Sequence, residues 1–195
     1  MAKLYFRYGA MNSGKSSILM QVAHNYEENN MKVLVIKSVI DTKASNKLSS
    51  RIGLEREVDI LLGKDESLVS YYKNINGIVN CILVDEAQFM NENQIEELWY
   101  ISKMFDIPVI CYGLRTDFKS NLFPGAKRLM ELADTIEENS TICECGKKAK
   151  FNARFDNGEF TLDGESVVID GAFKDTVYKP MCGKCYLKKR LQYKR

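Results

Sequence analysis

The sequence predicts an α/β fold, a parallel sheet flanked by helices, followed by a small unit of different character. Apolar runs of strand length alternate with stretches of helical periodicity as far as about residue 138. Beyond that point short strand-like pieces, turn residues and four cysteines replace the alternation. Since strands that alternate with helices form parallel sheets, we expect one domain over residues 1–138 and a second over 139–195.

The first predicted strand, residues 3–8, runs directly into a phosphate-binding loop. Residues 9–16 read GAMNSGKS and fit the pattern G-x-x-x-x-G-K-[ST], after which apolar residues recur at helical spacing. Glycines let the backbone approach phosphates closely, and the N-terminus of the following helix attracts anions. Lys15 would reach the β- and γ-phosphates, and the Ser16 hydroxyl would hold magnesium. The predicted sheet is therefore of the P-loop NTPase type, and the phosphate-binding residues would be Gly9, Ala10, Met11, Asn12, Ser13, Gly14, Lys15 and Ser16.

The next predicted strand covers residues 32–37, a continuous apolar run that is typical of a strand buried on both faces. A polar, serine-rich segment follows as far as Ser50, and we interpret it as a mobile loop. Residues 58–62 predict a further strand, and the apolar residues between 68 and 72 predict a short helix. The strand–helix alternation thus continues through this region.

A strand that ends in two carboxylates comes next, because residues 81–86 read CILVDE. In P-loop proteins an apolar strand beside the P-loop strand usually ends in an Asp that serves magnesium, and Asp85 fits this role. Glu86 follows at the carboxyl end of the strand, where parallel sheets bind their ligands. A carboxylate there can accept a proton from an attacking hydroxyl, either of water in an ATPase or of a second substrate in a kinase. The motif alone leaves both reactions open.

Two more helices and one strand complete the first predicted domain. Asn91 with Gln94 three residues later forms a capping-box pattern that predicts a helix start. Residues 108–113 predict a strand, and the segment through Pro124 leads into another helix. The residues expected on the inner face of the first of these helices are Ile95, Leu98, Trp99, Ser102 and Phe105.

Two cysteine pairs in the second predicted domain have the spacing of metal ligands. One reads C-E-C-G and the other C-G-K-C, and two such turns can supply four thiolates to one tetrahedral zinc ion. A closed set of four thiolates leaves no open position, so the zinc of this zinc-ribbon-like unit would be structural. A redox-active pair is the alternative. The predicted ligands are Cys143, Cys145, Cys182 and Cys185.

Composition excludes several other classes of protein. The formal charge of only +2 gives no support for a protein that binds nucleic acid or a membrane over much of its surface. No apolar run approaches the roughly 20 residues that span a bilayer. Six cysteines without a secretion signal favour thiols or metal over disulfides, so we expect a cytoplasmic protein. The basic residues 188–195 are expected to form a solvated tail. The alternative is a nucleotide-switched binding module in which these residues bind nucleic acid. The two functions differ in what accelerates ATP turnover, which would be a nucleoside for a kinase and a polynucleotide for the binding module.

The motifs in their order resemble one known family. GAMNSGKS is followed by a strand with DTK, then by SSRIGL, CILVDEAQF and YGLRTDF, with a cysteine turn and a final C-x-x-C-Y. This series resembles the zinc-containing type II thymidine kinases, and several spellings are similar to an enterobacterial and phage branch. The resemblance extends over nearly the whole chain.

The resemblance implies a mechanism and a set of partners. ATP would donate its γ-phosphate to thymidine or deoxyuridine, and Glu86 would deprotonate the 5′-hydroxyl of the nucleoside. Asp85 and Gln88 would lie beside the magnesium ion and the nucleotide. A lasso-like loop of the small domain would close over the nucleoside, and the enzyme would be a homotetramer inhibited by dTTP. The substrate-binding residues that the resemblance implies are Phe89, Leu114, Phe118, Phe123, Val168, Ile169, Asp170 and Tyr178.

Overall fold

The computed structural model describes residues 1–38, 46–166 and 176–193. Its centre is a sheet of six parallel strands in the order β5-β2-β6-β7-β1-β8. The strands are β1 (Leu4–Tyr8), β2 (Val33–Ser38), β5 (Ile60–Leu62), β6 (Cys81–Asp85), β7 (Val109–Gly113) and β8 (Thr135–Glu138). The predicted α/β class with a parallel sheet is confirmed.

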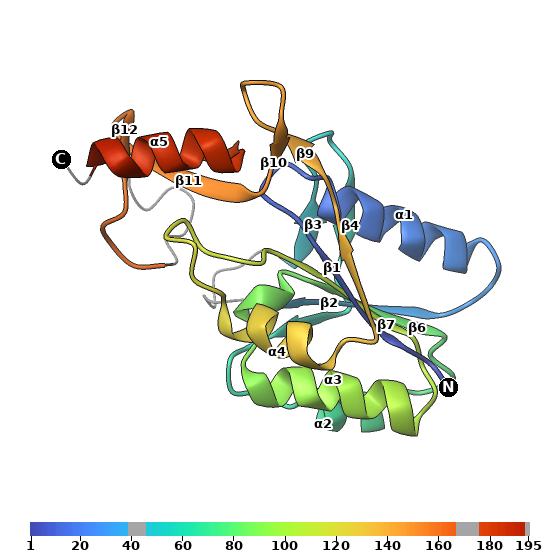
Figure 1. Cartoon of the computed structure of the whole chain (residues 1–195). Helices are drawn as coiled ribbons and strands as arrows, with labels where there is room; N and C mark the ends of the chain where they lie inside the picture. The colour runs from blue at the N-terminus through green and yellow to red at the C-terminus, as the bar shows by residue number, and fades with distance from the viewer. Residues whose placement is uncertain (39–45, 167–175, 194–195) are drawn as a thin grey trace.

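Helices cover both faces of this sheet (Figure 1). Helix α1 (Lys15–Glu27) packs on one face, and α2 (Leu68–Lys73), α3 (Glu92–Met104) and α4 (Pro124–Leu132) lie on the other. Successive strand residues point to opposite faces, so β2 places Val33 and Val35 under α1 while Leu34 and Ile36 join the core of the other face. An apolar run without alternation is what a strand buried on both sides requires.

The order of the strands corrects one expectation. We expected the strand that ends at Asp85 to lie beside the P-loop strand, but β7 lies between β6 and β1. Helix α1 nevertheless packs across both β7 and β6. Its first turn therefore comes close to the end of β6, although the two strands are not neighbours.

The segment expected to be a mobile loop contains a strand in its described part. Strand β3 (Lys47–Ser49) pairs with β4 (Glu55–Glu57) as an antiparallel hairpin, and Leu48 is buried against the core under α1. An ion pair of 2.7 Å between Arg56 Nη2 and Glu27 Oε1 also fastens the hairpin to α1. Residues 39–45, which include the DTK motif, lie outside the described residues.

The inner face of α3 is only partly as expected. Ile95, Leu98 and Ser102 are buried, but Trp99 is 41% and Phe105 40% exposed. Gln94 and Ile101 take the remaining inward positions, because they share the helical face of the other three at 3.6 residues per turn.

The capping box predicted at the start of α3 is confirmed. The Gln94 N–H donates to Asn91 Oδ1 at 2.8 Å, and the Asn91 N–H donates to Gln94 Oε1 at 3.2 Å. We expect Asn91→Ala to lower the free energy of unfolding by about 1 kcal/mol, because it leaves a helix N–H without its acceptor. Thermal unfolding of Asn91→Ala and Asn91→Ser measures this loss, and the serine variant, which keeps an acceptor, should recover most of it. An equally low melting temperature for both variants would contradict the capping role.

The C-terminal part forms smaller sheets with an apolar cluster of its own. A short hairpin joins β9 (Thr141–Ile142) to β10 (Lys148–Ala149), and a three-stranded antiparallel sheet has the order β12 (Glu159–Thr161), β11 (Phe151–Asp156), β13 (Thr176–Met181). Helix α5 (Gly183–Tyr193) packs on this sheet and buries Tyr186. Residues 188–193, expected in a tail, therefore belong to a helix, although most of their side chains are exposed.

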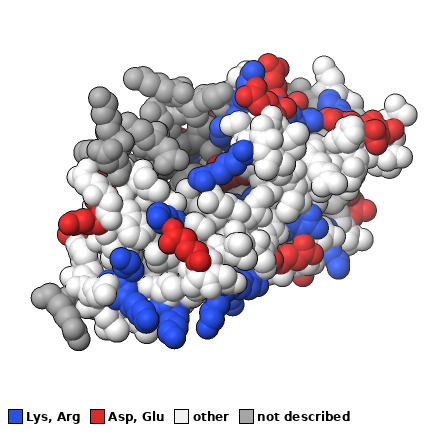
Figure 2. Space-filling view, turned by 90° about the horizontal axis from the view of Figure 1, so that it is seen from above, with Lys and Arg blue, Asp and Glu red and all other residues white. Residues whose placement is uncertain are grey.

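The surface carries charges of both signs. Figure 2 shows Lys and Arg side chains interspersed with Asp and Glu on the face seen from above, with several basic side chains together along one margin. Within the described ranges, no helix combines the length and the apolar character needed to cross a membrane.

Candidate active site

The P-loop, residues 9–16, joins β1 to α1 and has a tightly turned backbone. Asn12 and Gly14 have positive φ angles of 65° and 73°, in the left-handed region that few side chains adopt easily. At Gly9 a Cβ atom would lie 2.4 Å from Ser13 Oγ and 2.5 Å from the Asn139 carbonyl oxygen. Only glycine fits at that position, so the sequence pattern corresponds to a real steric requirement of the loop.

Lys15 folds back over the loop that precedes it. Its Nζ donates to the carbonyl oxygens of Gly9 (3.3 Å) and Ala10 (3.1 Å) and to Ser13 Oγ (3.3 Å). Burial lowers the pKa of Lys15, while the nearby carboxylates of Glu86 and Asp85 act in the opposite direction. The ammonium group thus lies within the curve of the loop, where phosphate oxygens can replace its carbonyl partners.

Asp85 and Ser16 meet at the end of β6. The Ser16 hydroxyl donates to Asp85 Oδ2 at 3.0 Å, and the Asp85 side chain is almost fully buried. Burial, and next to it the charge of Glu86, raises the pKa of Asp85 to about 7, although the Ser16 hydroxyl opposes the rise. A hydroxyl and a buried carboxylate with nearby negative charge form a donor set that suits magnesium, which prefers oxygen ligands. The two residues therefore fit the predicted magnesium site.

Glu86 follows in a strained backbone conformation. Its φ of 53° lies in the left-handed region, where a non-glycine residue is held only by surrounding structure. The 3₁₀ turn η1 (Ala87–Phe89) comes next and buries Gln88 completely. Gln88 Nε2 donates to Glu86 Oε2 at 2.5 Å, and Gln88 Oε1 accepts the Leu114 N–H at 2.9 Å.

Gln88 therefore orients the Glu86 carboxylate against the end of β7. A Cβ atom on Gly113 would lie 2.6 Å from Gln88 Oε1, so a larger residue at 113 would displace this amide. The family resemblance implies that Gln88 lies near the magnesium ion and the nucleotide, and the structure adds the contact by which Gln88 holds Glu86.

The aromatic residues implied for nucleoside binding lie in two pairs. Phe89 and Phe123 meet edge to face with ring centroids 5.6 Å apart, and Leu114 packs against the same core. Phe118 and Tyr178 form the second pair, at 6.4 Å. The lasso residues implied for the base edge, namely Val168, Ile169 and Asp170, lie outside the described residues.

The segment from Leu114 to Phe123 is fastened by side chains that sequence reasoning missed. These bonds run from Tyr186 Oη to the Phe118 carbonyl (2.6 Å), from Ser166 Oγ to Asp117 Oδ2 (2.8 Å) and from Asn152 Nδ2 to the Thr116 carbonyl (3.3 Å). Asn152 Oδ1 also accepts the Met11 N–H of the P-loop at 2.8 Å. The available signal was a polar residue in the strand FNARFD, whose position 152 is 5% exposed.

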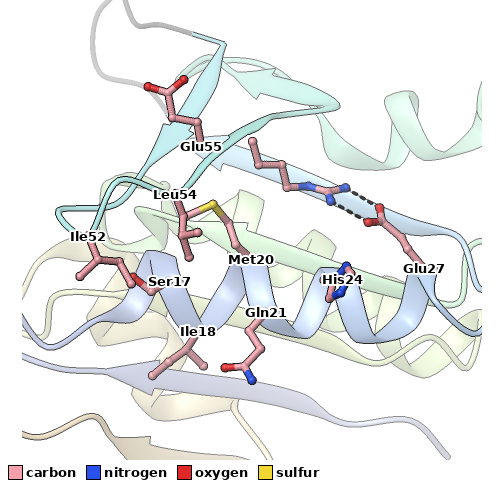
Figure 3. Close-up of a pocket in the computed structure, with 10 residues that line it drawn as sticks. Ser17, Ile18, Met20, Gln21, His24, Glu27, Ile52, Leu54 and Glu55 are labelled. Atoms are coloured by element: carbon pink, nitrogen blue, oxygen red, sulfur yellow. Dashed lines mark hydrogen bonds and ion pairs between the residues drawn. The ribbon is translucent and has the colours of Figure 1, made fainter.

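A hollow on the outer side of α1 contains none of the predicted site residues (Figure 3). It lies between α1 and the β3–β4 hairpin, and the Arg56–Glu27 pair closes one part of it. His24 is one of the residues that line the hollow, and its Nε2 lies 3.3 Å from Glu28 Oε1. The sequence assigns this histidine no role. The apolar lining comes from Ile18, Met20, Ile52 and Leu54.

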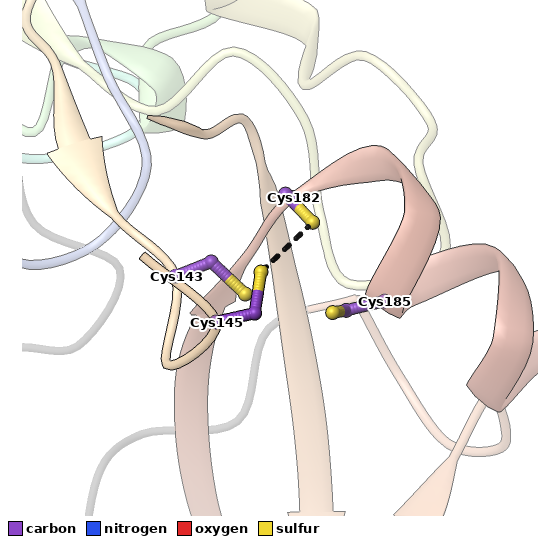
Figure 4. Close-up of side chains that lie close together, drawn as sticks. All are labelled: Cys143, Cys145, Cys182 and Cys185. Atoms are coloured by element: carbon purple, nitrogen blue, oxygen red, sulfur yellow. Dashed lines mark hydrogen bonds between the residues drawn. The ribbon is translucent and has the colours of Figure 1, made fainter. Parts of the chain in front are cut away.

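The four cysteines of the C-terminal part come together as predicted (Figure 4). Their sulfur atoms all lie within 4.8 Å of one another, and Cys145 Sγ is 3.6 Å from Cys182 Sγ. Zinc–sulfur bonds of about 2.3 Å in a tetrahedron place sulfurs roughly 3.8 Å apart, so the cluster fits zinc. A backbone hydrogen bond from Cys185 lowers the pKa of Cys182 to about 7, and one from Cys145 lowers the pKa of Cys143. These backbone donors favour the thiolate form of two of the four cysteines, whereas hydrogen bonds with the other three thiols raise the pKa of Cys185 to about 12.

Comparisons with known proteins agree with these motifs. The family model described as thymidine kinase matches residues 2–186. A thymidine kinase of Streptococcus gordonii is 42% identical over 190 residues, which is 96% of this chain and 97% of that protein. Two further thymidine kinases are each 43% identical. The one from Francisella tularensis subsp. holarctica matches over 94% of this chain and 96% of that protein, and the one from Chromobacterium violaceum matches over 95% of this chain and 98% of that protein.

Among solved structures, an ATPase domain has 16% identity and a TM-score of 0.47, over 78% of this chain and 75% of that one. This likeness adds nothing to the assignment, which the sequence relatives carry. A family model that spans nearly the whole chain, together with relatives above 40% identity, establishes that the chain belongs to the thymidine kinase family.

Proposed function

We propose that this protein transfers the γ-phosphate of ATP to the 5′-hydroxyl of thymidine, giving dTMP and ADP, and that it also accepts deoxyuridine. The observation that carries the proposal is the contact between the P-loop hydroxyl of Ser16 and Asp85, directly beside Glu86. This arrangement supports the proposal because the side chains that would serve the nucleotide, the magnesium ion and the proton transfer lie together at one end of the sheet. Membership of the thymidine kinase family supplies the acceptor.

The proposed reaction needs a base and an aligned donor. The 5′-oxygen of thymidine forms a bond to the γ-phosphorus, and the bond between the γ-phosphorus and the oxygen that bridges it to the β-phosphate breaks. ADP leaves with that oxygen, and Glu86 takes the proton of the hydroxyl. Gln88, which donates to Glu86 Oε2 at 2.5 Å, keeps this carboxylate in one orientation. Holding both reactants in line provides a large share of the rate enhancement.

The phosphate side of the site neutralises charge. Residues 9–16 would surround the phosphates, and Lys15 would exchange its present carbonyl partners for phosphate oxygens. Ser16 and Asp85 would hold magnesium, which when bound neutralises charge on the β- and γ-phosphates. The 3.0 Å contact between Ser16 Oγ and Asp85 Oδ2 supports the assignment, because two oxygens so close together can be ligands of the same ion.

The nucleoside side of the site would be built mainly from aromatic residues. Phe89 and Phe123, the Phe118–Tyr178 pair and Leu114 are the described candidates for contacts with base and sugar. Residues 168–170 would read the base edge through main-chain groups. This arrangement corresponds to the proposed division into an ATP-binding domain (1–138) and a zinc-binding domain with the substrate loop (139–195).

Further properties of the protein are also proposals. We infer a structural zinc ion on the four cysteines, a homotetramer, inhibition by dTTP and a cytoplasmic location. The support is the cysteine geometry for zinc, the resemblance of the motifs for the tetramer and the inhibition, and the cysteine composition for the location.

ADP release in the presence of Mg·ATP tests the reaction directly. The purified protein is assayed with each of four deoxynucleosides, with deoxyuridine and, separately, with single-stranded DNA. We expect turnover with thymidine and deoxyuridine only, and its loss in Lys15→Met, which removes the ammonium from the same loop. Stimulation by DNA but by none of the nucleosides would overturn the proposal.

A further inference from the structure

A single amide side chain joins the P-loop to two other parts of the molecule. Asn152 lies on β11 of the C-terminal part, yet its Oδ1 accepts the backbone N–H of Met11 at 2.8 Å. Its Nδ2 donates to the Thr116 carbonyl oxygen at 3.3 Å, in the segment between β7 and α4. The side chain is 5% exposed, so water does not readily replace these bonds.

Both partners of Asn152 belong to segments with assigned chemistry. Met11 is the third residue of the P-loop and precedes Asn12, which has a left-handed backbone. A P-loop binds phosphates through its backbone N–H groups, so a fixed Met11 amide fixes the directions of its neighbours. Thr116 lies two residues before Phe118, which is on the proposed nucleoside side.

The surroundings of Asn152 argue against a purely local role. Its strand neighbours Phe151, Ala153 and Phe155 belong to or pack against the apolar cluster of the C-terminal part, and by strand alternation the Asn152 side chain points to the opposite face of the sheet, where it meets Met11 and Thr116. A buried amide in such a strand is unfavourable unless both of its ends are bonded. The two side-chain hydrogen bonds of Asn152 run to Met11 and Thr116, which lie outside its own sheet.

We propose that Asn152 is a positioning residue that holds the phosphate loop and the nucleoside-side segment at a fixed spacing. ATP binding would thereby depend on the C-terminal part, although that part contributes no residue to the P-loop. The inference rests on the proposed function for its kinetic consequences, whereas its effect on nucleotide affinity is independent of the acceptor.

The loss of both bonds is tested with Asn152→Leu, which keeps the branched shape and the number of side-chain heavy atoms but has no polar group. We expect the Kd for Mg·ATP, measured by calorimetry without nucleoside, to rise about tenfold, a typical size for coupling between two sites. In the kinase assay KM for ATP should rise more than KM for thymidine. Zinc content should stay at that of the unchanged protein.

Two further variants separate positioning from general stability. Asn152→Thr replaces the amide by a hydroxyl that can donate and accept, and it should recover part of the ATP affinity. Tyr186→Phe is the matched control, because it removes a bond from the C-terminal part to Phe118 and leaves the Met11 contact intact. It should raise KM for thymidine and leave the Kd of Mg·ATP unchanged.

The possible results discriminate between this inference and the proposed function. An unchanged Mg·ATP affinity in Asn152→Leu, or an equal loss in Tyr186→Phe, would overturn the positioning role. If the unchanged protein did not phosphorylate thymidine, and ATP affinity fell in Asn152→Leu but not in Tyr186→Phe, the proposed acceptor would be refuted and the positioning role supported.

Discussion

Replacing Glu86 by glutamine is expected to lower the rate of phosphoryl transfer by roughly 10²- to 10⁴-fold, the usual contribution of a general base. Glutamine has the same length and can still accept the hydrogen bond from Gln88 Nε2, so the turn after β6 should be retained. An amide cannot take the proton of the attacking hydroxyl. Affinity for Mg·ATP should stay nearly unchanged, because Lys15, Ser16 and Asp85 are intact.

Single-turnover kinetics with preformed enzyme–ATP complex and added thymidine isolates this step from product release. Glu92→Gln is the matched control, since it makes the same chemical change on the exposed first turn of α3. We expect the control to retain the rate of the unchanged protein. A Glu86→Gln variant with a near-normal rate would remove Glu86 from the base role and leave positioning as the source of catalysis.

The arrangement of the P-loop and of the strand end at Asp85 could be predicted because both patterns are local in sequence. The P-loop is one continuous stretch, and its glycine pattern has a steric cause that the contact distances at Gly9 make explicit. Asp85 and Glu86 follow a run of apolar residues, so their place at a strand end needs no knowledge of the rest of the fold. The cysteine turns are equally local, and zinc geometry requires that two such turns meet.

The order of the strands is not local, and there the prediction was wrong. Hydrophobic runs identify β6 and β7 as buried strands, but both are buried at every position and fit equally well beside β1. Which strand is inserted depends on how the connections cross the sheet, which no residue pattern in either strand encodes. The expected contact of Ser16 with Asp85 forms all the same, because α1 packs across both β6 and β7 and so brings Ser16 to the end of β6.

The fastenings of the C-terminal part were missed for a similar reason. Asn152 and Met11 are 141 residues apart in sequence, and the partner on the P-loop is a backbone amide with no side-chain signature. The Tyr186 hydroxyl likewise bonds a backbone carbonyl, that of Phe118. A buried polar residue in a strand signals that a partner exists, and only the tertiary structure identifies it.

Loss of zinc from its proposed site on the four cysteines is expected to unfold the C-terminal part while the parallel sheet stays folded. Zinc binding contributes on the order of 10 kcal/mol to small modules. The apolar cluster here is small and includes Cys143 and Cys182 themselves. The main sheet has two larger apolar layers of its own, so its helices should persist. Because Asn152, Tyr178 and Tyr186 all lie in the part that unfolds, KM should rise for thymidine and for ATP together.

Cys182→Ser tests this expectation against Cys111→Ala, in which a buried thiol of β7 outside the cluster is removed. Zinc content, circular dichroism and thermal unfolding are measured beside the kinetics, and the unchanged protein is treated with a chelator in parallel. We expect Cys182→Ser and the chelated protein to lose zinc, to show an early separate unfolding transition and to bind both substrates weakly. Cys111→Ala should keep its zinc. A metal-free sample with unchanged melting and unchanged KM values would show that the four thiols lie together for another reason, with redox chemistry of the Cys145–Cys182 pair as the next hypothesis, since these sulfurs lie 3.6 Å apart.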